Sequence, residues 1–215
     1  MLSRTHGRLS LVSRGSRSAK SRLKGILRPF LPLSLSWVIR SDLGTLTGAE
    51  MHGAPLMLQG DALLSAYYMN ELLLHLLHRH DPQPEIFDLY GAAIRELAGS
   101  VAVGPALRRF EIELLRMLGY ALNLEHDTQS QEALDPEQLY EYQVEYGPVP
   151  VHEKRRARAY TGAQLEAIRQ QQFADPAVLL DASRLLRDVI AFHLGGKELK
   201  SRKVLMELRR PIDKQ

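Results

Sequence analysis

The hydrophobic pattern of this chain changes its period near residue 57, and this change limits the chain to a mixed fold. Before that point, apolar residues alternate with polar ones, as in strands with one buried face. After it, they recur at intervals of three and four, as in amphipathic helices. For a chain of 215 residues this predicts an α+β protein, with a small sheet domain at residues 1–56 and a mainly helical domain at residues 57–215.

Three strands are expected in the first domain. The first contains Leu9 and Leu11 on one side and Arg8 and Arg14 on the other, and it ends at a turn at Gly15. The second covers residues 33–39, and its expected packing face is Leu33, Leu35, Trp37 and Ile39. After a turn at residues 41–44, the third covers residues 45–51. Together they predict a small, curled sheet.

The second domain is expected to contain at least six helices and one hairpin. Helical spacing predicts a long, largely apolar central helix from about residue 58, and further helices at 85–97 and 105–118. Others begin near Thr161 and at Asp175, where Asp as N-cap and the following Pro176 are start signals. A last helix is expected at 201–208. The alternation of Tyr140, Tyr142 and Tyr146 with polar residues indicates a short strand or hairpin.

Positive charge is concentrated at the start of the chain. Nine of the 28 Lys and Arg residues lie within residues 1–41, whereas none of the 25 Asp and Glu residues does. Clustered Lys and Arg side chains displace the counterions condensed on phosphates, so this asymmetry indicates a polyanionic partner. Two alternatives stay open. The segment also fits a solvated basic arm, and its Arg-rich, Ser-rich and acid-poor composition fits a mitochondrial import peptide.

Further basic groups occur in the helical part. One surrounds the Gly195-Gly196 corner and consists of Lys197, Lys200, Arg202 and Lys203. Another lies at residues 154–158. Each group alone also fits a solvated surface, but with the opening segment they can form a discontinuous phosphate-binding surface.

Two arginines precede an aromatic residue in the helix expected at 105–118. Arg108 and Arg109 stand next to Phe110. Guanidinium groups beside apolar surface can hold a carboxylate and a hydrophobic side chain together. The alternative is that both arginines are exposed and Phe110 belongs to the core.

Catalytic and cofactor signatures are missing from the sequence. The chain contains no cysteine, which excludes disulfides, zinc ribbons and thiol catalysis. Gly195-Gly196-Lys197 lacks the spacing of a phosphate-binding loop. A metal-dependent nuclease built on His75, His78 and His80 is an alternative, but no carboxylate is spaced to complete the ligand shell. No apolar stretch approaches the ~20 residues needed to span a bilayer. The protein is therefore expected to be soluble and to have no enzymatic activity, metal or cofactor.

Four pieces of the sequence, in order and at matching spacing, resemble the bacterial recombination mediator RecO. They are HGRLSLVSRGSR with SRLKGILRPFLPL at residues 6–33, YMNELL at 68–73, LRRFE with LGY at 107–120, and HLGGKELKSR at 193–202. The resemblance covers nearly the whole chain.

The resemblance implies an N-terminal oligonucleotide-binding (OB) barrel at residues 1–56 and a helical domain at residues 57–215. RecO proteins normally begin some two dozen residues earlier, so the barrel is expected to lack its first strand. Many members also carry a four-cysteine zinc site near the hairpin that corresponds to residues 123–146. The absence of cysteine places this chain with the zinc-free branch.

The resemblance also implies a function in DNA repair and homologous recombination. RecO proteins bind single- and double-stranded DNA, anneal strands, engage the C-terminal tail of the single-stranded-DNA-binding protein, and load RecA together with RecR, in the bacterial cytoplasm at the nucleoid. Arg108, Arg109 and Phe110 correspond to the tail-binding position. The residues expected to bind DNA are the basic ones already described, namely Arg8, Arg14, Arg17, Lys20, Arg22, Lys24, Arg28, Lys197, Lys200, Arg202 and Lys203. The alternative is an imported helical structural protein whose basic N-terminus is cleaved.

Overall fold

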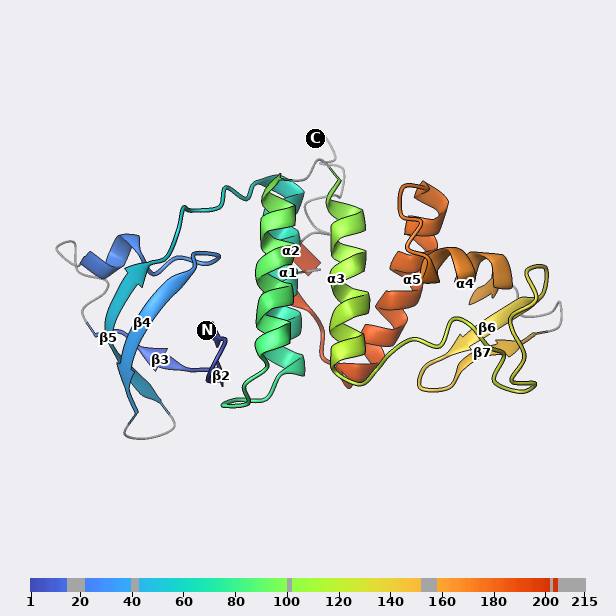
Figure 1. Ribbon diagram of the computed structural model, residues 1–215, viewed down its shortest axis with the longest axis horizontal. Coiled ribbons are helices and arrows are strands. Elements are labelled where there is room, and N and C mark those ends of the chain that lie inside the picture. The colour runs from blue at the N-terminus through green and yellow to red at the C-terminus, as the bar shows by residue number, and fades with distance from the viewer. Residues whose placement is uncertain (15–21, 40–42, 100–101, 152–157, 202, 205–215) are drawn as a thin grey trace, which may run out of the picture. The chain divides into compact units, whose positions relative to one another are not determined.

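The computed structural model describes residues 1–14, 22–39, 43–99, 102–151, 158–201 and 203–204, except for the side chains of Arg22 and Lys24. Within these ranges the chain forms five α-helices and several small sheets, so the prediction of a mixed helix and sheet protein is confirmed (Figure 1). The residues divide into two compact units. The first consists of Met1–Gly99 and the described residues from Leu199 onward, and the second is Ser100–Glu198.

The first unit contains two small sheets. Strands β1 (Leu2–Ser3) and β2 (Gly7–Arg8) pair antiparallel. In the other sheet, β5 (Gly44–Met51) lies between β3 (Leu11–Val12), which is parallel to it, and β4 (Leu33–Val38), which is antiparallel. In the part of the chain that the structure describes, these sheets are open and no barrel closes.

Strand β4 has the predicted alternation. Leu33, Leu35 and Trp37 are half-buried, and the residues between them are exposed. The Trp37 ring meets the ring of His6 edge-on at 5.0 Å between centroids. Ile39 was expected on the same face, but β4 ends at Val38 and Ile39 is 50% exposed. The prediction for Ile39 was therefore wrong, because the alternation holds only within the strand.

Helices α1 (Gly60–Leu76) and α2 (Pro84–Gly99) pack against each other in the first unit. The buried side of α1 includes Ala66, Met69 and Leu72, while Leu74 is 52% exposed. The helix is therefore apolar beyond its buried face. A hydrogen bond of 2.6 Å from the Tyr90 hydroxyl to Asn70 Oδ1 joins the two helices.

The opening segment is attached to the α1–α2 connection through β2. The His80 amide donates to the Arg8 carbonyl at 3.2 Å. At Gly7 the backbone has a φ of +64°, and a Cβ would lie 2.1 Å from the Asp81 carbonyl oxygen. Only glycine, which has no Cβ, fits at this distance. Gly7 therefore allows the opening segment to lie directly against the connection between α1 and α2.

The second unit contains α3 (Val103–Met117), α4 (Gly162–Arg169), α5 (Pro176–His193) and one antiparallel sheet. Helix α5 packs against both α3 and α4. In the sheet, β6 (Leu139–Gln143) lies between β7 (Gly147–Pro150) and β8 (Ala159–Thr161). The hairpin formed by β6 and β7 confirms the prediction from the tyrosine alternation.

Local start signals set the beginnings of α4 and α5. Thr161 and Gln164 form a reciprocal capping box before α4, in which each side chain accepts from the other residue's amide. Asp175 Oδ1 accepts from the Ala177 amide at 2.8 Å, and Pro176 is the first residue of α5. Both predicted starts are confirmed. The helix expected at 201–208 falls mainly outside the described residues.

Among the helices of the described ranges, none combines the length and the apolar character needed to cross a membrane.

Candidate nucleic-acid interface

The described basic residues of the opening segment differ in exposure. Arg14 and Arg28 are exposed, whereas Arg8 in β2 is half-buried and its Nε is buried without a hydrogen-bond partner. Of the other predicted DNA-binding residues, Arg17, Lys20 and Arg202 lie outside the described residues, as do the side chains of Arg22 and Lys24. Of the predicted DNA-binding residues in this segment, Arg14 and Arg28 are therefore those whose described side chains are exposed and fit a contact with phosphate.

Arg4 is held by an acidic neighbour. Its guanidinium donates to both carboxylate oxygens of Asp88 on α2, at 3.0–3.3 Å. The hydrogen bonds and charge of Arg4 lower the pKa of Asp88. The pair fastens the β1–β2 turn to α2, so part of the positive charge of the opening segment is offset within the first unit.

Two lysines from the end of the chain belong to the same unit. Lys200 and Lys203 are exposed and are separated from the opening segment by most of the sequence, yet the first unit contains both. Lys197 is also exposed, but it belongs to the second unit. The fold thus places Arg14, Arg28, Lys200 and Lys203 in one compact body.

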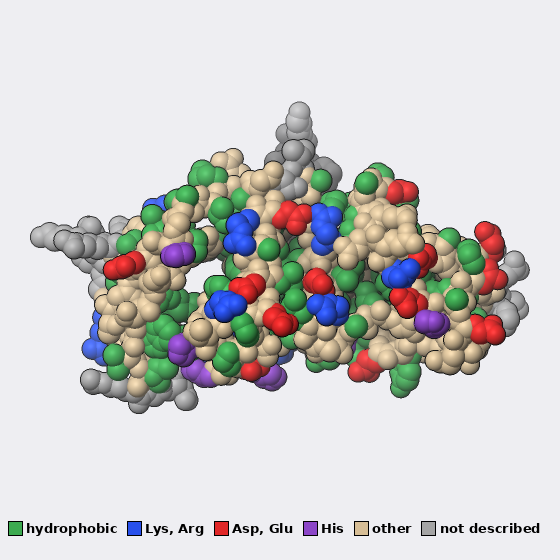
Figure 2. All heavy atoms as spheres, viewed as in Figure 1, with side chains coloured by type: hydrophobic (Ala, Val, Ile, Leu, Met, Phe, Trp, Pro, Cys, Tyr) green, Lys and Arg blue, Asp and Glu red, His purple; other side chains and the backbone are tan. Residues whose placement is uncertain are grey.

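Charges of both signs are mixed on the helices. On the face shown in Figure 2, Lys and Arg side chains over the helices lie beside Asp and Glu side chains. This face of the helices therefore differs from the opening segment, which contains no acidic residue before Asp42.

The group Arg108, Arg109 and Phe110 lies on α3. Phe110 is only 1% exposed. The Arg108 side chain is 11% exposed and donates at 3.0 Å to Glu111, whose side chain is 1% exposed. Arg109 is half-buried. Phe110 is therefore a core residue, as the sequence allowed, but Arg108 is not the exposed residue that this alternative assumed.

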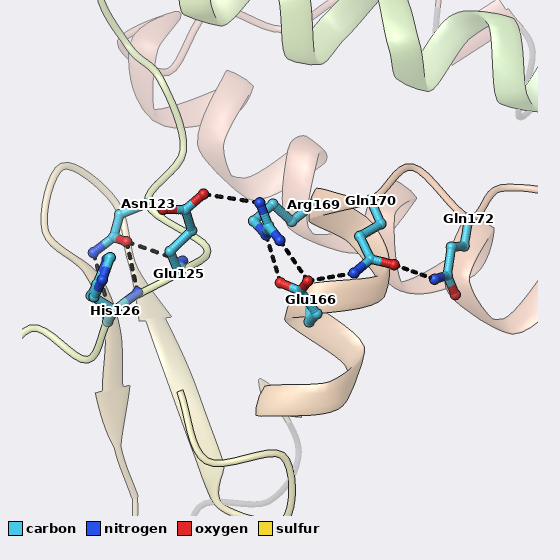
Figure 3. A network of polar contacts seen from close by, with 7 residues as sticks. All are labelled: Asn123, Glu125, His126, Glu166, Arg169, Gln170 and Gln172. Atoms are coloured by element: carbon cyan, nitrogen blue, oxygen red, sulfur yellow. Dashed lines mark hydrogen bonds and ion pairs between the residues drawn. The ribbon is translucent and has the colours of Figure 1, made fainter. Parts of the chain in front are cut away.

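A pocket of about 640 Å³ lies in the second unit, and sequence reasoning did not identify it. Arg169 stands in it between two carboxylates, with Nη1 3.0 Å from Glu125 and Nε 2.6 Å from Glu166 (Figure 3). Glu166 also accepts from Gln170, whose own oxygen accepts from Gln172. The Glu166–Arg169 pair follows from their i,i+3 spacing. Glu125 lies 44 residues before Arg169 in the chain, and no local pattern connects them.

The segment near which the resemblance implies a zinc site in other family members is held by side-chain hydrogen bonds in this chain. Asn123 Oδ1 accepts from the amides of Glu125 and His126, and Asn123 Nδ2 donates to the His126 carbonyl. Asp127, 7% exposed, accepts from the amides of Gln129 and Ser130. The chain has no cysteine to bind zinc, so the residues present do not fit that site.

His75, His78 and His80, considered above as metal ligands, lie at the end of α1 and in the connection that follows it. In the described ranges, no group of three or more His, Asp or Glu side chains is arranged to hold a metal ion. His75 is the basic residue in the last turn of α1, a position that favours positive charge.

Comparison with known proteins identifies the same family over both parts of the chain. The family model for the recombination protein O N terminal matches residues 1–54, and that for the recombination protein O C terminal matches residues 57–203. The chain is 41% identical to the DNA repair protein RecO of Methylococcus capsulatus over 199 residues, which are 93% of this chain and 81% of the relative. It is 43% identical to RecO of Nitrosococcus oceani over 206 residues, 95% of this chain and 84% of that protein.

A more distant member agrees over almost the full chain. RecO of Aliivibrio fischeri is 38% identical over 212 residues, which cover 99% of this chain and 89% of the relative. These relatives are named for DNA repair, and the two family models match this chain in sequence order. Both findings assign the chain to the same family. The chain belongs to the RecO family of DNA repair proteins.

Proposed function

We propose that this protein binds single- and double-stranded DNA without catalysing a reaction, and that it anneals strands and loads RecA together with RecR. The observation that carries the proposal is that Arg14, Arg28, Lys200 and Lys203 are all exposed and all belong to the first unit. These exposed cations come from opposite ends of a chain that belongs to a DNA repair family. The protein would act in the bacterial cytoplasm at the nucleoid.

The DNA surface is proposed to extend over the other predicted basic residues. These are Arg8, Arg17, Lys20, Arg22, Lys24 and Arg202, and Lys197 of the second unit is proposed as a separate DNA contact. The open sheet β3–β5–β4 would be part of an OB domain at residues 1–56, with residues 57–215 as the helical domain. In proteins that bind single strands, basic side chains follow the DNA backbone, while exposed aromatic rings stack on bases. Trp37 packs on His6, so charge rather than Trp37 stacking is the main source of affinity in this proposal.

Charge reversal at two exposed arginines tests this function. The variant with Arg14→Glu and Arg28→Glu is expected to bind a fifty-base single strand at least tenfold more weakly at about 0.1 M salt, because phosphate contacts dominate such affinities. The slope of log K against log salt should fall by about 0.7 for each lost contact. Fluorescence anisotropy over a salt series measures both quantities.

The control carries the same change in net charge at other exposed arginines. Arg95→Glu with Arg187→Glu lies on α2 and α5, outside the proposed surface. It should retain most of the affinity and the salt slope. Equal losses in the two variants, or wild-type binding that does not depend on salt, would contradict the proposal.

A second proposed contact is with the C-terminal tail of the single-stranded-DNA-binding protein, at Arg108, Arg109 and Phe110. Arg109 is the residue suited to test it, because Phe110 is a core residue and loss of Arg108 would leave the buried Glu111 without the guanidinium that binds it. Arg109→Ala is expected to weaken binding of an acidic peptide ending in Phe about tenfold, the effect of losing a charge-assisted hydrogen bond. Its DNA affinity should stay at the wild-type value. Titration calorimetry measures the affinity for the peptide. If Arg109→Ala weakened only DNA binding, the assignment of Arg109 to the tail contact would be refuted.

A further inference from the structure

Glu71 on α1 receives the chain where it returns to the first unit. Glu71 Oε1 accepts from the Lys200 amide at 2.8 Å. Oε2 accepts from the Ser201 amide at 2.9 Å and from the Ser201 hydroxyl at 2.6 Å. One carboxylate thus binds three donors that lie 129 and 130 residues further along the chain.

The three donors belong to the beginning of a helical turn. The Lys203 amide donates to the Leu199 carbonyl, as in an α-helix, so the amides of Lys200 and Ser201 precede the first intrahelical bonds. Such amides need acceptors from elsewhere, and a negative charge there is also favoured by the helix dipole. Here the acceptor is supplied by α1.

The contact stabilises the ionised form of Glu71. Burial alone acts against ionisation, but the hydrogen bonds from Ser201 and Lys200, with the nearby His75, outweigh it and the pKa of Glu71 is lowered. The carboxylate therefore stays charged at neutral pH and its bonds are charge-assisted, which makes them stronger than neutral ones.

The contact with Glu71 lies where the chain leaves the second unit and returns to the first. The second unit ends at Glu198, and Leu199 is the first residue that belongs again to the first unit. Just before, Gly195 and Gly196 both have positive φ, at +60° and +80°, so the chain turns sharply there. Lys200 and Ser201, bound by Glu71, are the first residues after Leu199.

We propose that Glu71 is a positioning residue that holds Lys200 and Lys203 on the DNA-binding surface of the first unit. The proposal rests on the DNA binding proposed above. It also relates two of the motifs that resemble RecO, since Glu71 lies in YMNELL and Ser201 in HLGGKELKSR.

Hydrogen exchange tests the contact itself. In Glu71→Ala, the amides of Lys200 and Ser201 are expected to exchange about tenfold faster or more, as the loss of a charge-assisted bond implies. The matched control is Asn70→Ala, one residue away, because Asn70 Oδ1 accepts from the Tyr90 hydroxyl and not from the returning chain. It should leave those two amides unchanged. Wild-type exchange rates in Glu71→Ala would overturn the proposal.

DNA binding tests the consequence, and the sign of the effect is decisive. Removing an anion from a DNA-binding unit should strengthen binding by simple electrostatics. If Glu71 positions the two lysines, the opposite is expected, and Glu71→Ala should bind single-stranded DNA several-fold more weakly. The slope of log K against log salt should then fall by up to about 1.4, the value for two lost phosphate contacts. Asn70→Ala should keep the wild-type slope. Tighter or unchanged binding in Glu71→Ala would overturn the proposal.

Non-additivity identifies the lysines as the residues affected. Lys200→Ala with Lys203→Ala should weaken DNA binding about as much as Glu71→Ala does. The variant with all three substitutions should lose little more affinity, because the effects of substitutions in residues that act together do not add. Losses that multiply in the triple variant would refute this role for Glu71. If the wild-type protein binds no DNA, the proposed function fails, while the exchange of Lys200 and Ser201 still decides whether Glu71 holds the chain.

Discussion

Phe110→Ala is expected to destabilise α3 by about 3–5 kcal/mol, the usual cost of truncating a fully buried aromatic side chain. Phe110 is 1% exposed, and Leu114 and Leu115 on the same helix are equally buried. The cavity left by the ring removes contacts as well as hydrophobic burial. Native-state hydrogen exchange of the α3 amides measures the effect.

The matched control is Phe192→Ala at the end of α5, where the ring is 51% exposed. Its cost is expected to be less than about 1 kcal/mol, since an exposed ring gains little from burial. If both substitutions cost the same, Phe110 is not the core residue described above. If Phe110→Ala were stable and lost only peptide binding, its ring would instead be a direct contact with the partner tail.

Arg108→Ala is expected to cost about 3 kcal/mol, although it replaces a charged residue. The substitution leaves Glu111, whose side chain is 1% exposed, without the guanidinium that binds it at 3.0 Å. Removing one member of a buried ion pair is costly because the remaining charge stays away from water. Urea unfolding followed by the exchange of α3 amides measures the loss.

The control for this pair lies on the same helix with the same i,i+3 spacing. Arg116 pairs with Glu113, and these side chains are 58% and 38% exposed. Arg116→Ala should cost about 0.5 kcal/mol or less, because exposed ion pairs contribute little. A similar cost for both substitutions would show that burial of Glu111 does not matter. The comparison also explains why Arg109, rather than Arg108, is the appropriate residue for testing the tail contact.

The sequence predicted best what is encoded within a few neighbouring residues. Asp175 was identified as a helix start because a cap needs only the next few residues. The structure contains this cap, and the helix predicted near Thr161 also begins with one. The spacing of Arg108 and Glu111 likewise permits a pair. The burial of this pair does not follow from the spacing, because burial depends on which other segments cover the helix.

Contacts between distant segments were not predictable from pattern. Nothing in the periodicity of α1 distinguishes Glu71 as the acceptor for Lys200 and Ser201, and Arg169 reaches Glu125 in the same non-local way. The parallel pairing of β3 with β5 also escaped prediction. Alternation identifies strands and their faces, but it carries no information on which distant strand lies beside them.

The discontinuous first unit has a consequence for synthesis. A ribosome releases α1 long before Ser201, because 130 residues separate Glu71 from that residue. The intervening second unit can fold as a body while the first still lacks its last piece, since domains emerge and fold in order. The basic surface proposed here would therefore be completed only after Lys200 and Lys203 have been made, and a nascent chain stopped before Lys200 would display only the basic residues of the opening segment.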